Sequence, residues 1–483
     1  ERRDSLIPLD ERSFKGAFFT PLNVVDKAYD KLHEILGNNW QREYYVWDMC
    51  CGVGNLEVKH SNPRNIFMST LDVADVDIMK ATKTCVAAER FQYDYLNDDI
   101  TNDGKIDYAL TNKLPEKLRK AIKDGKKILV LINPPYGETG SGIGKGDKNK
   151  KEVEKTKVNA MMKDLELGYA SKELFAQFLV RIAAEIPNAI VALFGTLKYV
   201  NAPNFEKFRS FWNASYLGGF VVHSKAFDGL KGDFPIGFLI WRTNNTPKAK
   251  RTDINDVFVD VLDKNAKPIG EKCFYRLANT RFLSGWIDKP KTNDQLALPL
   301  SNAVKVSNNP RLKTSCDGMI GYLYASNNDL QHAGQETLIT SSIYTGGNGG
   351  GVYIMPANLW QVAVVFSVRL LVSHTWLNHD DQFLIPTEPL TEEFKNDCLL
   401  WMLFHGKNLT ASANDLEWQN KKWSIVNHFI PYTEEEVNSP ERFESDFMAQ
   451  YLKGKKLSNE AKQVLASGRL LWQTYFLHID ERN

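Results

Sequence analysis

Apolar residues follow two different spacings in the first half of the chain. Over residues 16–36, GAFFTPLNVVDKAYDKLHEIL, they recur every three or four positions, which predicts a helix with Thr20 as N-cap and Pro21 in its first turn. Helical patterns also occupy residues 74–89 and 171–187. Strands that alternate with helices indicate an α/β protein built on a parallel sheet. The aliphatic runs that predict strands stand at residues 44–49, 65–72, 128–132 and 188–195.

This alternation ends in the second half of the chain. Two more strands are expected at 218–224 and 234–242, and the polar stretch TNNTPKAKRTDIND after them predicts a linker. From residue 285 onward, Asn/Ser clusters and a glycine-rich turn stand among helical stretches, which predicts a mixed α+β domain. We therefore expect a first domain over 1–256, a connecting hairpin over 257–284 and a second domain over 285–483.

Composition narrows the class of protein. The 483 residues are 43% hydrophobic and 25% charged, which suits a globular protein of two or three domains. No apolar run reaches about 18 residues, so we expect no membrane span. The six cysteines form no CxxC pair and no Cys/His cluster with metal-ligand spacing. These features predict a cytoplasmic protein without a metal site.

Positive charge is concentrated in two places, although the formal net charge is only +1. A lysine-rich segment covers residues 145–157, and TPKAKR covers residues 246–251. Each is a candidate loop for contacting phosphate groups, and each is equally compatible with a solvated surface loop. The low total charge argues mildly against a nucleic-acid-binding protein.

A strand that ends in Asn-Pro-Pro-Tyr is the first chemical signal. A residue before proline is pushed toward extended geometry, and this applies to both Asn133 and Pro134. Prolines have no N–H, so Pro134 and Pro135 leave carbonyl acceptors on a stiff backbone. The Asn133 amide adds another acceptor, and Tyr136 adds a flat ring. The segment suits an –NH₂ group on a planar ring, and its alternative is a proline-rich turn after an edge strand.

The stretch DMCCGVG is the second chemical signal. Asp48 ends a predicted strand, and Gly52 and Gly54 make a turn whose backbone can approach a ligand closely. Asp72, at the end of the next strand, is placed to accept hydrogen bonds from ribose hydroxyls, or else to cap the following helix. A dinucleotide site is an alternative, but Glu57 stands where its third glycine would be.

These stretches, taken in order, resemble the N6-adenine DNA methyltransferases of the gamma class. The resemblance covers residues 14–242 and departs from the common DPACGSG form by having Met49 in place of proline. It implies a Rossmann-like S-adenosylmethionine-dependent methyltransferase sheet, S-adenosylmethionine as cofactor and double-stranded DNA as partner. The motifs that carry it are GAFFTP (16–21), DMCCGVGN (48–55), TLD (70–72), QYDYL (92–96) and NPPY (133–136).

The resemblance also implies roles for individual residues. A catalytic pocket would be formed by Asn133, Pro134, Pro135 and Tyr136. A flipped target adenine would stack between Tyr136 and Phe227, with Phe234 as the rival to Phe227 and core packing as the alternative for both. The resemblance implies no metal. The implied cofactor-binding residues are Thr20, Pro21, Asp48, Gly52, Gly54, Asp72, Asp94 and Tyr95.

The resemblance predicts a site-specific adenine methyltransferase of a restriction–modification or phage-defence system. The domain over 285–483 would then recognise the DNA target, and a restriction or specificity subunit, or a nuclease fused before Glu1, is an expected partner. Asn-Pro-Pro-Tyr also occurs in methyltransferases of protein glutamine and of ribosomal RNA amines, which differ from this chain in lacking so long a second domain. A non-catalytic DNA-binding module is disfavoured because the cofactor and catalytic motifs are both present.

Overall fold

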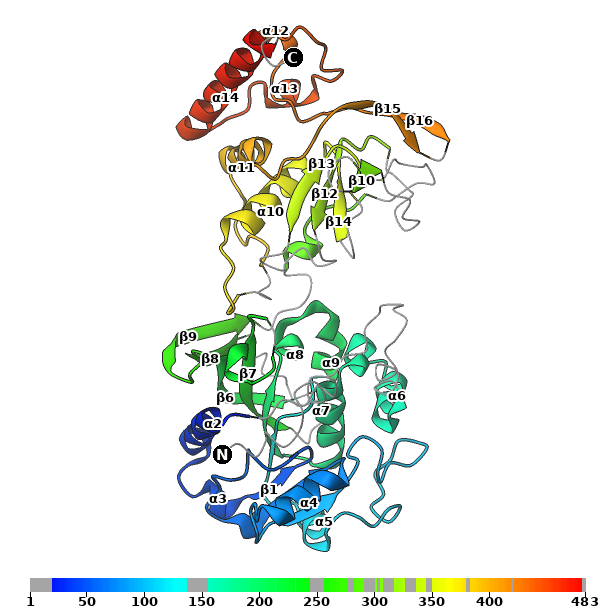
Figure 1. The fold of residues 1–483 in the computed structure, drawn as a ribbon, viewed down its shortest axis with the longest axis vertical. Coiled ribbons are helices and arrows are strands. Elements are labelled where there is room, and N and C mark those ends of the chain that lie inside the picture. Colours follow the sequence, from blue (N-terminus) through cyan, green and yellow to red (C-terminus); the bar gives the residue numbers. More distant parts are fainter. Residues whose placement is uncertain are drawn as a thin grey trace. The chain divides into compact units, whose positions relative to one another are not determined.

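The structure is a computed structural model, and its chain divides into two compact units, Glu1–Ala278 and Asn279–Asn483 (Figure 1). The lysine-rich segment up to residue 154 and the expected linker over 244–255 lie outside the described residues. The structure describes residues 20–136, 155–212, 214–230, 232–243, 256–275, 282–290, 300–301, 305–306, 317–325, 336–344, 350–378, 383–418 and 420–479.

A nine-stranded sheet forms the centre of the first unit, in the order β3-β2-β1-β4-β5-β7-β6-β8-β9. The five strands from β3 to β5 pair in parallel, whereas β7 lies antiparallel between β5 and β6. The strands are β1 (Tyr45–Asp48), β2 (Ile66–Thr70), β3 (Glu89–Gln92), β4 (Ile128–Ile132), β5 (Ile190–Gly195), β6 (Ala214–His223), β7 (Pro235–Thr243), β8 (Asp256–Leu262) and β9 (Pro268–Tyr275).

This order identifies the fold. A doubly wound sheet has the order 3-2-1-4-5-6, and here an antiparallel β7 stands between strands 5 and 6. That insertion characterises the Rossmann-like fold of S-adenosylmethionine-dependent methyltransferases, so the predicted fold class is confirmed. The hairpin β8–β9 forms as the apolar alternation predicts, and β8 pairs with β6. The hairpin therefore extends the sheet of the first unit.

Helices cover the sheet of the first unit. They are α2 (Leu22–Leu36), α3 (Trp40–Glu43), α4 (Val73–Ala81), α5 (Glu116–Lys123), α6 (Lys157–Asp164), α7 (Leu174–Glu185), α8 (Lys198–Asn201) and α9 (Glu206–Phe211).

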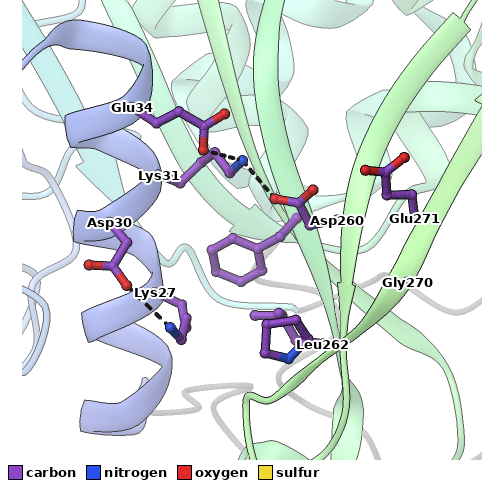
Figure 2. A pocket seen from close by; sticks show the side chains of 10 residues that line it. Lys27, Asp30, Lys31, Glu34, Asp260, Leu262, Gly270 and Glu271 are labelled. Atoms are coloured by element: carbon purple, nitrogen blue, oxygen red, sulfur yellow. Dashed lines mark hydrogen bonds and ion pairs between the residues drawn. The ribbon is translucent and has the colours of Figure 1, made fainter.

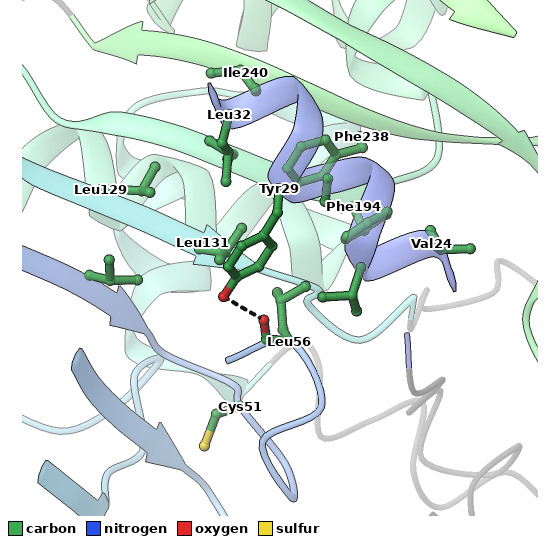
Figure 3. Packing of buried hydrophobic residues seen from close by; sticks show 14 of the residues in the cluster. Val24, Tyr29, Leu32, Cys51, Leu56, Leu129, Leu131, Phe194, Phe238 and Ile240 are labelled. Atoms are coloured by element: carbon green, nitrogen blue, oxygen red, sulfur yellow. Dashed lines mark hydrogen bonds between the residues drawn. The ribbon is translucent and has the colours of Figure 1, made fainter. Parts of the chain in front are cut away.

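The apolar face of α2 packs on the sheet. Val24, Tyr29 and Leu32 are buried among residues of β4, β5 and β7 (Figure 3). The Tyr29 hydroxyl donates a hydrogen bond to the carbonyl of Leu56 at 3.0 Å, so its one polar atom is satisfied inside the core. This contact joins α2 to the chain segment that follows the glycine turn.

Two helix boundaries differ from the sequence prediction. The N-cap of α2 is Pro21, which makes no side-chain cap bond, and Thr20 is not the cap. Helix α4 ends at Ala81, because the Thr82 hydroxyl bonds back to the Ile78 carbonyl and Lys83 has a positive φ of 54°. A side chain that bonds the backbone competes with continued helix, and a positive φ ends it.

The second unit is mixed α+β, as predicted. An antiparallel sheet, β13-β12-β14, packs with α10 and α11 around its own buried apolar core. The elements are β10 (Leu300–Ser301), β11 (Lys305–Val306), β12 (Gly321–Ala325), β13 (Thr337–Thr340), β14 (Gly350–Ile354), α10 (Leu359–Leu371), α11 (Glu392–Phe404), β15 (Ala413–Trp418), β16 (Lys421–Ile425), α12 (Glu434–Val437), α13 (Phe447–Leu452) and α14 (Asn459–Leu477). In the part of the chain that the structure describes, no helix combines the length and apolar character needed to cross a membrane.

Candidate functional site

Three of the predicted site residues stand at the carboxyl ends of adjacent strands. Asp48 is the last residue of β1, Asp72 follows β2, and Asn133 follows β4. Because β1 pairs in parallel with both β2 and β4, these three ends lie on one edge of the sheet. This edge is where open α/β sheets bind ligands.

The Asn133 amide is held at both ends. Its Nδ2 donates to the Thr20 hydroxyl at 3.0 Å, and its Oδ1 accepts from the Tyr136 hydroxyl at 2.8 Å. Two motifs 113 residues apart in the sequence are thus joined by one side chain. The Thr20 hydroxyl serves this contact, which explains why the residue precedes the helix without capping it.

The surroundings of Asn133 favour a rigid amide. Pro134 is buried, and the half-buried Tyr136 packs against the main core cluster. Burial raises the pKa of the Tyr136 phenol, so the phenol remains protonated and able to donate. The two contacts therefore orient Oδ1 as the acceptor end of the amide, and a carbonyl oxygen has a second lone pair for another donor.

The glycine turn after β1 is tightly packed. Asp48 is buried and its Oδ1 accepts from the Cys50 N–H at 2.8 Å. Gly52 and Gly54 have φ values of 52° and 86°, where L side chains are strained. A Cβ on Gly54 would lie 2.6 Å from the end of the Met68 side chain and 2.9 Å from Thr84 Cγ2, so both side chains would have to shift.

Glu57 is a site residue that the motif comparison did not single out. It is fully buried, and neither carboxyl oxygen has a hydrogen-bond partner among the described residues. Burial raises the pKa of Glu57 well above its usual value, and the neighbouring Asp48 carboxyl raises it further. Burial also raises the pKa of Asp48, to about 6. The sequence offers one signal that could have pointed to Glu57: it is an acidic residue between two apolar ones, Leu56 and Val58, directly after the glycine turn.

Asp72 is the N-cap of α4. Its Oδ1 accepts from the Ala74 N–H at 3.0 Å, so the capping alternative is observed. The residue is exposed at the sheet edge, and its neighbours Leu71 and Val73 are 66% and 58% exposed. Two exposed apolar side chains beside an exposed carboxylate suit a ligand with an apolar ring and hydroxyl groups.

Asp94 organises the turn that follows β3. Its Oδ1 accepts from the Leu96 N–H at 3.1 Å, and its Oδ2 accepts from the Asn97 amide at 2.8 Å. The carboxylate thus stabilises the loop in which it stands. Its predicted bond to the cofactor adenine stays a prediction.

Tyr95 has a different place from the one expected. Its side chain is 2% exposed, and its ring stacks on Phe178 with centroids 5.5 Å apart. Its hydroxyl donates to Glu185 at 2.7 Å, and Glu185 also pairs with the fully buried Arg181. The Arg181 guanidinium donates to the carbonyl of Asp98 at 2.9 Å. These contacts hold Tyr95 in the protein interior beside the Asp94 loop, and its predicted part in cofactor binding stays a prediction.

The two candidate stacking phenylalanines differ in exposure. Phe227 is 2% exposed and packs edge-on against Phe194, with ring centroids 5.9 Å apart. Phe234 is half-buried and lies against the same core cluster as Tyr136. Phe227 therefore lies in the core cluster, directly after the short 3-10 turn Ser224–Ala226 that follows β6. Phe234 keeps an accessible ring.

A hollow of about 400 Å³ lies apart from these residues, between α2 and the β8–β9 hairpin (Figure 2). Its charged groups pair with one another. Lys31 bonds Glu34 and Asp260 at 2.6 Å each, and Lys27 bonds Asp30 at 3.2 Å (Figure 2). The Lys31–Asp260 pair attaches the hairpin to α2, whereas the other two pairs lie within α2. None of the predicted site residues lines the hollow.

The chain is similar to known proteins in its three-dimensional structure. No protein-family model matches the chain. No curated protein matches it. Within the described residues, no group of three or more His, Cys, Asp or Glu side chains could hold a metal ion.

Three similar solved structures illustrate the range of matches. A nuclease-deletion mutant of the Type ISP restriction–modification enzyme LlaGI, in complex with a DNA substrate mimic, is 10% identical, with a TM-score of 0.48 over 80% of this chain and 54% of that one. The DrdV–DNA complex is 10% identical, with a TM-score of 0.45 over 82% and 58%. A type I restriction–modification methyltransferase subunit from Streptococcus thermophilus is 14% identical, with a TM-score of 0.31 over 57% and 48%. The chain spans less than two thirds of each of these proteins.

Proposed function

We propose that the chain is a site-specific DNA methyltransferase that transfers a methyl group from S-adenosylmethionine to adenine N6, within a restriction–modification or phage-defence system. The observation that carries the proposal is the Asn133 amide, held between Thr20 and Tyr136 at the carboxyl end of β4. This acceptor stands at the same sheet edge as the glycine turn of β1. The motif resemblance supports the choice of adenine as the target base.

The residues at this edge fit the proposed cofactor. Its ammonium group needs an anionic partner, and the buried Asp48 beside the glycine turn supplies one. Its ribose needs an acceptor, and Asp72 stands exposed between two exposed apolar side chains. Thr20 and Pro21 would hold the amino-acid end, and Asp94 the adenine amine. When bound, S-adenosylmethionine supplies an electrophilic methyl group on a positively charged sulfur.

The chain's own contribution is to make N6 of adenine nucleophilic. The N6 lone pair is delocalised into the ring, so hydrogen-bond acceptors on its two hydrogens favour a pyramidal nitrogen. Asn133 Oδ1 and the Pro134 carbonyl would accept these hydrogens, and Pro135 stiffens the segment. Because the Asn133 amide is already held at both ends, little reorganisation is needed, which is electrostatic preorganisation.

Reaching N6 in this way requires the adenine to leave the duplex. Tyr136 would stack on the extruded base, which stabilises it by about 1–3 kcal/mol. The half-buried Phe234 is a better placed second ring than the buried Phe227, because it packs beside the same core cluster as Tyr136 and retains accessible surface. Double-stranded DNA is therefore the proposed substrate.

The second unit is proposed to recognise the DNA target. The cofactor and catalytic motifs all lie within the first unit, and the second unit has an independent apolar core. Base-edge contacts give specificity, and they need a surface other than the catalytic pocket. A restriction or specificity subunit, or a nuclease domain, is the proposed further partner.

A second candidate function is methylation of a protein glutamine or of a ribosomal RNA amine. The held amide of Asn133 favours any planar –NH₂ group and does not by itself select adenine. The separate second unit favours the DNA substrate, because a single side-chain amide needs no sequence-reading domain.

Expression of the chain in cells that lack adenine methylation tests the proposal. Sequencing that detects modified bases should find N6-methyladenine at one recurrent DNA motif. Unmodified DNA, together with methylated protein or RNA in the same cells, would favour the second candidate and overturn the first.

A further inference from the structure

We infer that Glu57 and Asp48 share one proton, act as a single negative charge behind the glycine turn, and make Glu57 a positioning residue for the cationic cofactor. The inference rests on the proposed function for the identity of the ligand. It concerns a residue that the motif resemblance does not assign.

Burial and missing partners are the first evidence. Glu57 is 0% exposed and Asp48 is 1% exposed, at the two ends of the turn that contains Gly52 and Gly54. A carboxylate only accepts hydrogen bonds, and both Glu57 oxygens lack a donor among the described residues. A proton on Glu57 changes this, because Glu57 can then donate to Asp48. Two buried carboxylates in contact cannot both remain ionised.

Among the described residues, the groups that face the pair supply no compensating cation. From α2, the Tyr29 hydroxyl already donates to the Leu56 carbonyl (Figure 3). From the loop after α4, Cys85 Sγ lies 3.5 Å from the Glu57 carbonyl. On the turn itself, the thiols of Cys50 and Cys51 have a raised pKa because of burial and the nearby Asp48, so they stay neutral. Asp75 of α4, which accepts from the Thr70 hydroxyl at 2.8 Å, is another acid.

The pair also connects to the proposed catalytic asparagine. The Cys50 thiol faces the Asp48 carboxylate, and the backbone N–H of Asn133 faces the Cys50 sulfur. A donor on Glu57 fixes Asp48, and Asp48 in turn holds the backbone of the turn through the Cys50 N–H.

The charge of the pair sets the pH range for cofactor binding. Burial raises the pKa of Asp48 to about 6, and burial together with the Asp48 charge raises the pKa of Glu57 well above its usual value. Above about pH 6 the pair carries one negative charge, which suits a ligand with an ammonium group. Below about pH 6 it becomes neutral, so affinity falls by about tenfold at one pH unit below the midpoint.

Replacement of Glu57 by glutamine separates this account from a purely structural role. The amide introduced by Glu57→Gln would donate permanently to Asp48, as the protonated Glu57 does, so Asp48 would ionise near the same pH. Binding should then keep its affinity and its midpoint near pH 6 without any carboxyl group at position 57. Glu57→Ala removes the donor and should weaken binding at every pH.

Titration calorimetry of the full chain with S-adenosylhomocysteine, from about pH 5 to about pH 8, measures these midpoints, with Asp77→Asn as control. Asp77 is an exposed acid on α4, and its replacement should leave the wild-type profile. A midpoint near that of the wild type in Glu57→Gln, together with weaker binding in Glu57→Ala, supports the shared proton. Loss of binding at the alkaline end of this range in a folded Glu57→Gln protein, or wild-type binding by Glu57→Ala, overturns it.

Thermal unfolding without ligand gives an independent readout. Acids with a raised folded-state pKa bind more protons when folded than when unfolded, so stability falls as pH rises above the usual carboxyl range. This fall should be smaller in Glu57→Gln than in the wild type. If the wild type binds no cofactor while the unfolding profiles differ as expected, the shared proton stands and the proposed function fails. Identical unfolding profiles overturn the shared proton.

Discussion

Replacement of Phe227 and Phe234 by alanine should affect different properties of the protein. Phe227 is 2% exposed and packs on Phe194, and removal of a buried phenylalanine costs about 3–5 kcal/mol of unfolding free energy. Phe234 is only partly exposed, so its replacement should cost less unfolding free energy than that of Phe227, roughly 1–2 kcal/mol.

For the rate of methyl transfer, we expect the opposite order: Phe234→Ala should have the larger effect and Phe227→Ala the smaller one. A ring that stacks on the extruded base contributes about 1–3 kcal/mol, so Phe234→Ala should lower methyl transfer by about fivefold to 150-fold. Phe227→Ala should lower transfer only as far as it unfolds the protein. Phe258, an exposed ring on β8, provides the matched control, and Phe258→Ala should change neither quantity.

Urea denaturation measures the first quantity, and transfer of tritiated methyl groups to DNA measures the second. DNA with 2-aminopurine at the target position reports base stacking directly. The fluorescence of its complex with Phe234→Ala should differ from that of its complex with the wild type. A Phe227→Ala protein of normal stability that loses transfer, beside an active Phe234→Ala protein, would refute the reasoning. It would mean that Phe227 leaves the core to meet the base.

Three further changes test other parts of the site. Tyr136→Phe removes the 2.8 Å bond to Asn133 but keeps the ring, so turnover should fall by about threefold to tenfold with DNA affinity retained, as measured by steady-state kinetics. Asp72→Ala should weaken cofactor binding in calorimetry and cost about 1 kcal/mol through the lost helix cap, whereas Asp72→Ser should restore the cap without restoring affinity. A chain ended after residue 278 should bind S-adenosylhomocysteine but methylate DNA without site preference, as judged by sequencing the product.

Several elements were predictable because their patterns are local. The aliphatic runs at β1, β2, β4 and β5 have every residue or nearly every residue buried, which is why each read as a continuous apolar strand. The helical pattern expected over residues 171–187 contains α7, which runs from Leu174 to Glu185. The Thr82–Cys85 region escaped prediction, because apolar spacing continues there while positive φ values end the helix.

Features that depend on spatial neighbours were harder to predict. In the sheet, β7 lies antiparallel between β5 and β6. The spacing of apolar residues along a strand does not reveal which strands are its neighbours, so the sequence could not predict this position. Tyr95 and Phe227 were placed by motif position, and their burial depends on Phe178 and Phe194 from distant segments. The pairing of Glu57 with Asp48 follows only from the folded turn.

Thr20 illustrates how the two kinds of prediction meet. Its position before an amphipathic segment indicated a helix cap, and its motif indicated the active site. The structure resolves the choice, because its hydroxyl accepts from Asn133 and the helix begins without a side-chain cap. Local propensity is overridden where a longer-range contact uses the same atom.

The central claim is tested most directly by methyl transfer from tritiated S-adenosylmethionine to duplex DNA, with the full chain, Asn133→Ala and the exposed control Asn38→Ala. After digestion to nucleosides, the label should appear in N6-methyldeoxyadenosine with the wild type and the control. It should fall by about 10²–10³ with Asn133→Ala, because the preorganised acceptor is lost, while affinity for S-adenosylhomocysteine is retained. Label in another nucleoside, or transfer by Asn133→Ala within a few-fold of the wild type, would contradict the account.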